Sequence, residues 1–153
     1  MYGVASEVDE LEWPWVLAEL AAAGTYWVVA RSPRHPHPRP VWGVWFGEAL
    51  HVSIGSPVLA RQLATDPAVT VHLDSGTDVV VVEGAVSAPS DDAPLIAAYD
   101  AKYDWHYDVG EYGPLTTIRP AVVLAWRSAG WAGRDGFRGA GRWRFDAVDG
   151  GSE

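Results

Sequence analysis

Short runs of alternating apolar and polar residues dominate this chain, and such runs are typical of β-strands buried on one face. Residues 69–74 alternate in this way, and residues 25–31, 121–126 and 142–145 are further short runs that read as strands. Residues 40–46 and 49–54 alternate on either side of Gly47-Glu48, which predicts a β-hairpin with a two-residue turn. The chain therefore reads as mostly β.

One run consists of a single apolar residue type. Residues 79–82 are four consecutive valines, and the run continues through Glu83 and Gly84. A strand that is apolar on both faces is expected in the centre of a sheet. A glycine inside a strand marks a bulge or a barrel corner, and we expect one at Gly84.

Three segments have helical patterns. Trp13, Val16, Leu17 and Leu20 recur at helical spacing, after Ser6 or Asp9 as possible caps. Ser56 is expected to cap a second helix at about 57–65, and Ser90 a third helix that runs to Tyr103. Two further segments, 32–40 with its four prolines and 107–114, are expected to be loops.

Six or seven strands interrupted by about three helices predict a mainly β (α+β) fold, a closed or nearly closed antiparallel barrel flanked by helices. The length of 153 residues fits one domain, which we place at residues 1–146, followed by a flexible tail at 147–153. A βαβ sheet is less favoured, because residues 26–54 offer three strands with no helix between them.

Composition excludes several classes of function and of chemical site. The formal net charge of −9 argues against a nucleic-acid partner, whose phosphates would be repelled over most of the surface. The absence of cysteine excludes disulfides, thiol nucleophiles and cysteine-based zinc sites. No apolar run approaches the roughly 20 residues of a membrane span, and the first residues are acidic, so we expect a cytoplasmic protein with no membrane partner.

Catalytic and metal-binding side chains are not identifiable from the sequence. His35 and His37 flank Pro36, but no third ligand is evident, and we expect no metal. His51 and His72 fall on the predicted polar faces of their strands, where a structural role is the commoner one. The catalytic residues remain unknown.

Arg39, Ser53 and the start of the helix after Ser56 can converge on one anion. A guanidinium, a hydroxyl and the free N–H groups of a helix N-terminus together form a phosphate site. The hairpin and the helix that follows it would bring these three groups together. The pattern therefore predicts an anion site, without naming the ligand.

The same hairpin and helix resemble those of the pyridoxamine 5'-phosphate oxidase-like family, the split-barrel flavin and deazaflavin proteins. The resemblance extends from Gly24 to Phe145, and its first fragment is similar to the actinobacterial type. It is carried by the order and spacing of Gly24-Thr25-Tyr26-Trp27, Pro40-Val41-Trp42-Gly43-Val44-Trp45, Leu63-Ala64-Thr65-Asp66-Pro67, Val81-Val82-Glu83-Gly84-Ala85, Tyr99-Asp100-Ala101-Lys102-Tyr103 and Arg142-Trp143-Arg144-Phe145.

The resemblance implies a split β-barrel that forms a homodimer, with a flavin-type cofactor in a groove between the subunits. It implies that Arg39 contacts the cofactor phosphate, that the backbone of Val41 lies beside the ring and that the Ser53 hydroxyl lies near the phosphate. The cofactor-binding residues expected on this basis are Arg39, Val41, Trp42, Ser53, Ile54, Gly55, Ser56 and Arg61.

The chain departs from the family pattern at the helix start. The family helix usually begins Ser-Arg-Lys, whereas here those positions are Pro57, Val58 and Leu59, and the next basic residue is Arg61. Two residues along a helix turn a side chain well away from the original face. Arg61 can replace the missing cations only if the first turn is reoriented.

Two functions remain open. The first is an FMN- or F420-dependent oxidoreductase that transfers hydride or electrons to or from a small organic substrate. Its cofactor is expected to be FMN first, F420 a close second, and an empty or haem-bearing groove third. The alternative is a diverged split-barrel protein that binds a ligand or haem without redox activity. Arg39 and Ser53 favour the enzyme, and the missing basic pair at Val58 and Leu59 favours the alternative.

Overall fold

The computed structural model describes residues 11–127 and 138–146. Its elements, in chain order, are α1 (Trp13–Ala22), β1 (Tyr26–Ala30), β2 (His37–Val41), β3 (Gly43–Phe46), β4 (Ala49–Val52), α2 (Pro57–Thr65), β5 (Ala68–His72), β6 (Asp78–Ser90), α3 (Ala93–Tyr103), α4 (Val109–Tyr112), β7 (Leu115–Arg127) and β8 (Arg138–Arg144). The mainly β prediction is confirmed.

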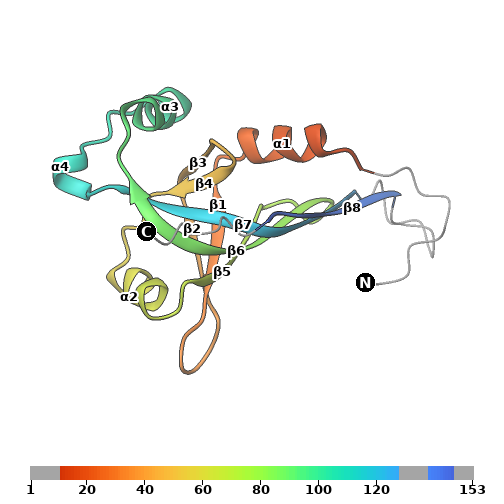
Figure 1. The fold of residues 1–153 in the computed structure, drawn as a ribbon, viewed down its shortest axis with the longest axis horizontal. Helices are drawn as coiled ribbons and strands as arrows, with labels where there is room; N and C mark the ends of the chain where they lie inside the picture. Colours follow the sequence, from red (N-terminus) through yellow and green to blue (C-terminus); the bar gives the residue numbers. More distant parts are fainter. Residues whose placement is uncertain (1–10, 128–137, 147–153) are drawn as a thin grey trace.

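All eight described strands belong to one antiparallel sheet, in the order β2-β1-β5-β6-β7-β4-β3, with β8 also paired to β7. The sheet curls around the long β6 and β7, and the result is a split barrel (Figure 1). Figure 1 shows α1 along one side of the sheet, α2 on the other side, and α3 and α4 together at one end. Among the described residues no helix is long and apolar enough to cross a membrane.

Two groups of buried side chains form the core. The larger fills the curl of the sheet, with α1 and α2 contributing Leu20, Leu59 and Leu63. The smaller lies under α3 and α4, where Val44 and Leu115 of the sheet meet Leu95, Tyr99 and Tyr107. The second group holds the two helices against the end of the barrel.

Local sequence signals explain several elements. Gly47 and Glu48 both have positive φ, 56° and 60°, so the predicted hairpin turn is confirmed. The Ser56 hydroxyl accepts a hydrogen bond from the Leu59 N–H at 3.2 Å, as expected of an N-cap. The register of β6 against β7 shifts between Glu83 and Gly84, which confirms a bulge at this glycine.

Four local predictions were wrong. The proline-rich segment 32–40 is not all loop: its second half forms β2, an edge strand, where prolines are tolerated because half of the N–H groups have no strand partner. The segment 107–114 contains α4. Ser90 ends β6, and Asp92 takes the N-cap position of α3. His51 is buried, not on a polar face, and its ring bonds to Thr117 and the Phe46 carbonyl.

Lys102 fastens α3 to the barrel. Its ammonium donates to the Tyr26 hydroxyl at 2.8 Å and to the Gly43 carbonyl at 2.9 Å, and it lies 4.6 Å from the centre of the Tyr26 ring. The neighbouring Tyr103 hydroxyl accepts a hydrogen bond from the Gly43 N–H at 2.9 Å. Burial lowers the pKa of Lys102 to about 8. One helix turn thus binds both backbone groups of Gly43.

The tight fit of Gly84 gives a first prediction. A Cβ at this position would lie 2.2 Å from the Arg119 carbonyl oxygen. This oxygen belongs to the backbone, so it can move away only if the strand itself shifts. We expect Gly84→Ala to lower the free energy of unfolding by about 1–3 kcal/mol in urea denaturation, the range for an overpacked interior. Gly55→Ala is the matched control, because its Cβ would meet nothing within 4 Å. Equal stability of the two variants would contradict the bulge as a packing constraint.

The Lys102 environment predicts a rise in stability with pH. The folded protein loses this proton near pH 8, whereas the unfolded chain holds it to near pH 10.5. The unfolded state therefore binds more protons between these values, and the free energy of unfolding increases with pH. We expect a gain of about 1 kcal/mol between about pH 7.5 and 9.5, reduced from the full pKa shift because Lys102 is only half-buried.

Lys102→Met is the comparison, and its free energy of unfolding should change less over the same range. The measurement stops at about pH 9.5 because burial raises the pKa of Tyr26 and Tyr103. A raised pKa keeps the proton on the folded protein, so stability falls as the unfolded tyrosines ionise near pH 10. Parallel pH curves for the parent and the variant would rule out Lys102 as the cause.

Candidate binding site

A pocket of about 320 Å³ opens where α3 and α4 meet the β3–β4 hairpin. We call it the aromatic pocket, and its lining residues are Trp42, Ser53, Tyr99, Trp105, Tyr107 and Tyr112. Five of the six are aromatic and none is charged. Such a wall suits a flat, apolar ring with one polar group.

The sheet supplies Trp42 and Ser53. Trp42 lies between β2 and β3, and Ser53 directly follows β4. The pairing of β3 with β4 continues one step past the strands, because the Ser53 N–H donates to the Trp42 carbonyl at 3.0 Å. This bond holds the two residues side by side at the mouth of the hairpin.

Stacking fixes the Trp42 ring. The ring lies parallel to that of Tyr103, with centroids 4.4 Å apart and planes 2° apart. Trp105 meets Trp42 edge-on at 6.1 Å and 88°. Trp42 remains 45% exposed and Trp105 50% exposed, so both retain surface for a ligand. Because Tyr103 is itself bonded to Gly43, the stack is positioned by the same contacts that hold α3.

Three hydroxyl groups meet in the pocket. Ser53, Tyr99 and Tyr107 line the same pocket, and the Tyr107 hydroxyl donates to the Gly113 carbonyl at 2.9 Å. Burial raises the pKa of Tyr99 to about 12, an effect that the Ser53 hydroxyl partly offsets. Burial also raises the pKa of Tyr107. Both phenols are therefore neutral at physiological pH.

Carboxylates organise the segment that carries Trp105 and Tyr107. Asp100 Oδ1 accepts a hydrogen bond from the Tyr107 N–H at 2.8 Å, and Asp108 caps α4 through the Glu111 N–H at 3.2 Å. Asp104 ends α3 in the left-handed conformation with φ of 49°. The turn that follows brings Trp105 and Tyr107 to the pocket.

The structure brings two of the eight predicted cofactor-binding residues into this pocket, Trp42 and Ser53. Val41 and Ile54, on either side of them, are partly buried and pack against the main core. Arg39 is exposed on β2 and its guanidinium donates to the Pro38 carbonyl at 2.7 Å.

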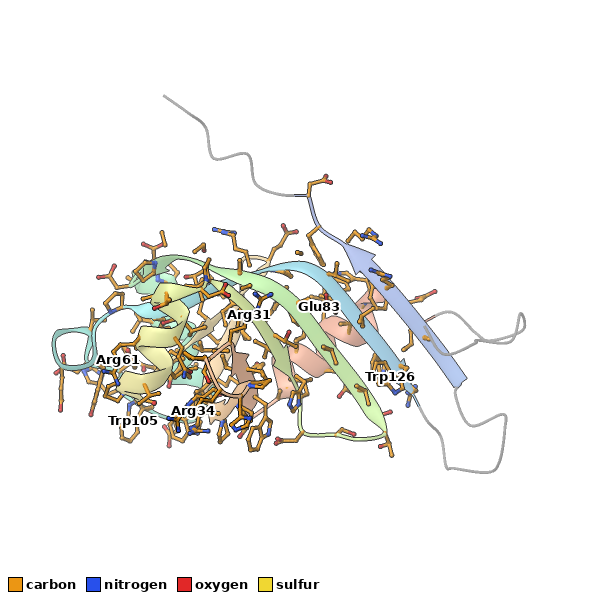
Figure 2. All side chains as sticks on the ribbon, turned by 90° about the horizontal axis from the view of Figure 1, so that it is seen from below. Arg31, Arg34, Arg61, Glu83, Trp105 and Trp126 are labelled. Carbon is orange, nitrogen blue, oxygen red and sulfur yellow. The ribbon has the colours of Figure 1, made fainter. Side chains whose placement is uncertain are left out.

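The other three predicted residues lie at and beyond the start of α2. Gly55 precedes the helix, and Ser56 uses its hydroxyl as the cap. Arg61 is exposed on α2, which Figure 2 shows as a separate element from the α3–α4 segment that carries Trp105. No described contact links Arg61 to the aromatic pocket.

The start of α2 offers little to a phosphate. Pro57 has no N–H, and the Leu59 N–H is taken by the Ser56 hydroxyl. Val58 therefore has the one uncommitted N–H of these three residues. Its side chain is exposed, whereas that of Leu59 is 1% exposed and belongs to the core. A ring fits the aromatic pocket well, but a dianionic phosphate would find few donors here.

Sequence reasoning missed Tyr99, Trp105, Tyr107 and Tyr112 as site residues. The signal was the aromatic density of residues 99–112. That density is equally typical of a core, and only the αL turn at Asp104 and the short α4 show that the rings line a pocket. Within the described residues no group of three or more His, Asp or Glu side chains could hold a metal ion.

Solved structures provide a comparison for the fold. A Listeria innocua protein proposed to be a pyridoxamine 5'-phosphate oxidase superposes with a TM-score of 0.58 at 18% identity, over 73% of this chain and 95% of its own. An F420 reductase gives 0.57 at 17% identity, over 69% and 93%. A FAD-binding protein from Mesorhizobium loti gives 0.60 at 15% identity, over 76% and 95%.

No protein-family model matches the sequence, and no curated protein matches it either. The identities to the solved structures are all low, so these comparisons speak to the fold. They cover most of this chain and nearly all of each neighbour. The chain has the split-barrel fold of the pyridoxamine 5'-phosphate oxidase-like and related flavin- and F420-binding proteins.

Proposed function

We propose that this protein is an oxidoreductase that uses a flavin-type cofactor and acts on a small organic molecule. The observation that carries the proposal is the position of Trp42 and Ser53 beside each other in the aromatic pocket. The family resemblance implies a cofactor at this hairpin, and the pocket supplies the stacking surface that a flavin ring requires. A bound flavin-type ring would supply the hydride or electron transfer.

The residues of this chain would bind and orient the ring. Trp42 is held flat by Tyr103, so it offers a preorganised face at small entropic cost. Trp105, which lies edge-on to Trp42, would cover part of the ring and keep water from it. The neutral hydroxyls of Ser53, Tyr99 and Tyr107 can receive or donate hydrogen bonds at its polar edge.

The choice of cofactor depends on the phosphate. FMN is our first candidate and F420 a close second, and both carry a phosphate that Arg39 would contact. Haem is a distant third. The few donors at the start of α2 imply that the ring contributes more of the affinity than the phosphate does.

Titration of the apo-protein with FMN, F420, riboflavin and haem tests the proposal. We expect FMN to bind most tightly, and riboflavin, which shares the ring but lacks the phosphate, to bind about 1.5–3 kcal/mol more weakly. If neither FMN nor F420 binds with a Kd below about 100 μM, about −5.5 kcal/mol, the oxidoreductase proposal should be abandoned.

Arg39→Ala isolates the phosphate contact. We expect it to weaken FMN binding by about 1.5–3 kcal/mol, the range for a charge-assisted hydrogen bond, and to leave riboflavin binding unchanged. Arg34→Ala is the matched control, an exposed arginine of the same hairpin outside the predicted set. Unchanged FMN affinity in Arg39→Ala would remove Arg39 from the site.

A homodimer is the second part of the proposal, and the outer face of the sheet supports it. Side chains on this face line up across β1, β5, β6 and β7: Trp27 with His72, Val81 with Leu124, and Val79 with Trp126. All are half-buried. The helix α1 lies on the opposite side of the sheet (Figure 1), and Figure 2 looks onto the outer face, with Glu83 and Trp126 along it.

This outer face is apolar, and the exposure of apolar surface to water is unfavourable. The central strand β6 is apolar on both sides, yet its outward Val79 and Val81 do not belong to either core cluster. An uncovered apolar sheet face of this kind marks an interaction surface. A second copy would bury it against itself by two-fold symmetry, with Glu83, Arg142 and Arg144 at the rim.

Leu124→Asp tests the dimer. A carboxylate in the middle of the apolar face should raise the dimer dissociation constant at least about tenfold, measured by sedimentation equilibrium. Ala121→Asp is the control, since Ala121 is exposed on the same strand. A parent protein that sediments as a monomer at micromolar concentration would refute the dimer.

The alternative function is a split-barrel module that binds a ligand without redox chemistry. The presence of Val58 and the buried Leu59 in place of the basic pair favours this function. Without these cations the protein has fewer groups to bind the phosphate of FMN, and its affinity for FMN is lower. Binding of haem, or of no flavin, in the same titration would support this second function.

A further inference from the structure

Lys102 is the one lysine of this chain, and its ammonium lies in the structure without a counter-ion. The two ion pairs of the described residues join arginines to aspartates. Lys102 instead donates to the Tyr26 hydroxyl and to the Gly43 carbonyl. Burial lowers its pKa to about 8, so the fold disfavours the charged form. Such a group is expected to serve a purpose other than stability, and its contacts indicate which.

The contacts of Lys102 lead to Trp42 through Gly43 and Tyr103. The Lys102 ammonium donates to the Gly43 carbonyl at 2.9 Å, and the Tyr103 hydroxyl accepts from the Gly43 N–H at 2.9 Å. The same hydroxyl lies 3.0 Å from the Gly24 carbonyl. Because Gly43 directly follows Trp42 and the Tyr103 ring stacks on Trp42, these bonds fix both the backbone beside Trp42 and the face against it. We call Lys102, Tyr103 and Gly43 the Gly43 clamp.

The backbone at Gly43 is also held from the side of the sheet. A Cβ at this position would lie 2.8 Å from the His51 carbonyl oxygen and 3.2 Å from the Tyr26 ring. The glycine therefore lies directly against β4 and β1, and a shift of the clamp cannot be absorbed by movement of Gly43 in that direction. The position of the last turn of α3 is passed on to Trp42.

The positive charge of Lys102 strengthens this clamp. The ammonium lies 4.6 Å from the centre of the Tyr26 ring and 5.3 Å from that of Tyr103, and both rings attract a cation. Charge-assisted hydrogen bonds are also roughly twice as strong as neutral ones. The titratable groups that face the ammonium are Tyr26 from β1 and Tyr103 from α3, whereas β3 offers the Gly43 backbone and α1 the Leu20 carbonyl that accepts from Tyr26. Burial raises the pKa of both phenols, so Lys102 is the member of this set that titrates between about pH 7 and 9.

We infer that Lys102 is a positioning residue of the aromatic pocket: its ammonium holds the end of α3 against Gly43, so that Tyr103 presents Trp42 flat to a ring. Loss of the charge, by a rise in pH or by substitution, loosens Trp42 and weakens ring binding. That the ring belongs to a flavin rests on the proposed function. The placement of Trp42 by the clamp does not.

Lys102→Met tests the inference through binding and stability together. Methionine removes the desolvated charge, and the Gly43 carbonyl can still accept from the Tyr103 hydroxyl at 2.9 Å, so the variant should be at least as stable as the parent in urea. We expect its Kd for riboflavin at pH 7 to be about three- to tenfold higher, the effect of one side chain that must now be ordered on binding. Equal affinity, or a variant that is also less stable than the parent, would overturn the inference.

The pH profile separates positioning from a general effect on the fold. Between pH 7 and 9 the parent should bind riboflavin progressively more weakly although its stability increases, because Lys102 loses its proton near pH 8. Lys102→Met should show no such change, and a titration of riboflavin itself would appear in this variant too. Arg127→Met is the matched control, since Arg127 is also a cation over an aromatic ring, 5.2 Å from that of Trp15. The control should follow the parent, and a control that behaves like Lys102→Met would overturn the assignment.

Fluorine NMR of the full chain labelled with 5-fluorotryptophan tests the clamp without any ligand. The resonance of Trp42 is the one missing from Trp42→Phe. We expect it to shift with a midpoint near pH 8 in the parent and in Arg127→Met, and to stay constant in Lys102→Met. A parent resonance without this titration, or a titration that persists in Lys102→Met, would overturn the inference. If riboflavin and FMN fail to bind the parent, the proposed function falls, and this resonance alone decides the role of Lys102.

Discussion

The pairing of β6 with β7 is the constraint on which the rest of the molecule depends. Each strand has 13 residues, and their ladder runs from Asp78 opposite Arg127 to Ser90 opposite Leu115. The first residues of β7 also pair with β4. This pairing positions Ser53, the residue that directly follows β4. The bulge at Gly84 bends the ladder midway, so one continuous pair of strands serves both halves of the barrel.

The aromatic pocket is a consequence of how α3 meets this barrel. The helix follows β6 directly, and Lys102 and Tyr103 tie its last turn to both backbone groups of Gly43. The same Tyr103 ring supports Trp42. Burial disfavours the charged form of Lys102 and lowers its pKa, so this ammonium adds little to stability. Its presence indicates that the position of this turn matters more than the stability that Lys102 contributes.

The sequence predicted the fold well because its signals were local. Gly47-Glu48, Ser56 and Gly84 each specify a turn, a cap or a bulge from one or two residues. The strand pattern around them predicted a barrel, and the family resemblance implied the split-barrel form. The pocket was harder to predict. Ser53 lies 46 residues before Tyr99 in the sequence, and Trp105 follows an αL turn at Asp104, where no glycine indicates a turn. In the acidic segment 100–111, the carboxylates of Asp100 and Asp108 and the backbone conformation of Asp104 shape the turn that presents the rings.

The aromatic pocket and the predicted anion site lie at different elements of this chain, and they differ in what they offer a ligand. In the predicted anion site, Pro57 removes one N–H, Ser56 occupies another, and Leu59 has moved into the core. Each change improves the helix itself, since proline near the first turn and a serine cap are both favourable there. The helix start is therefore favourable for stability but has few free donors for a phosphate, while Trp42 and Trp105 keep exposed surface. Both features agree with the proposal that the ligand is held mainly by its ring.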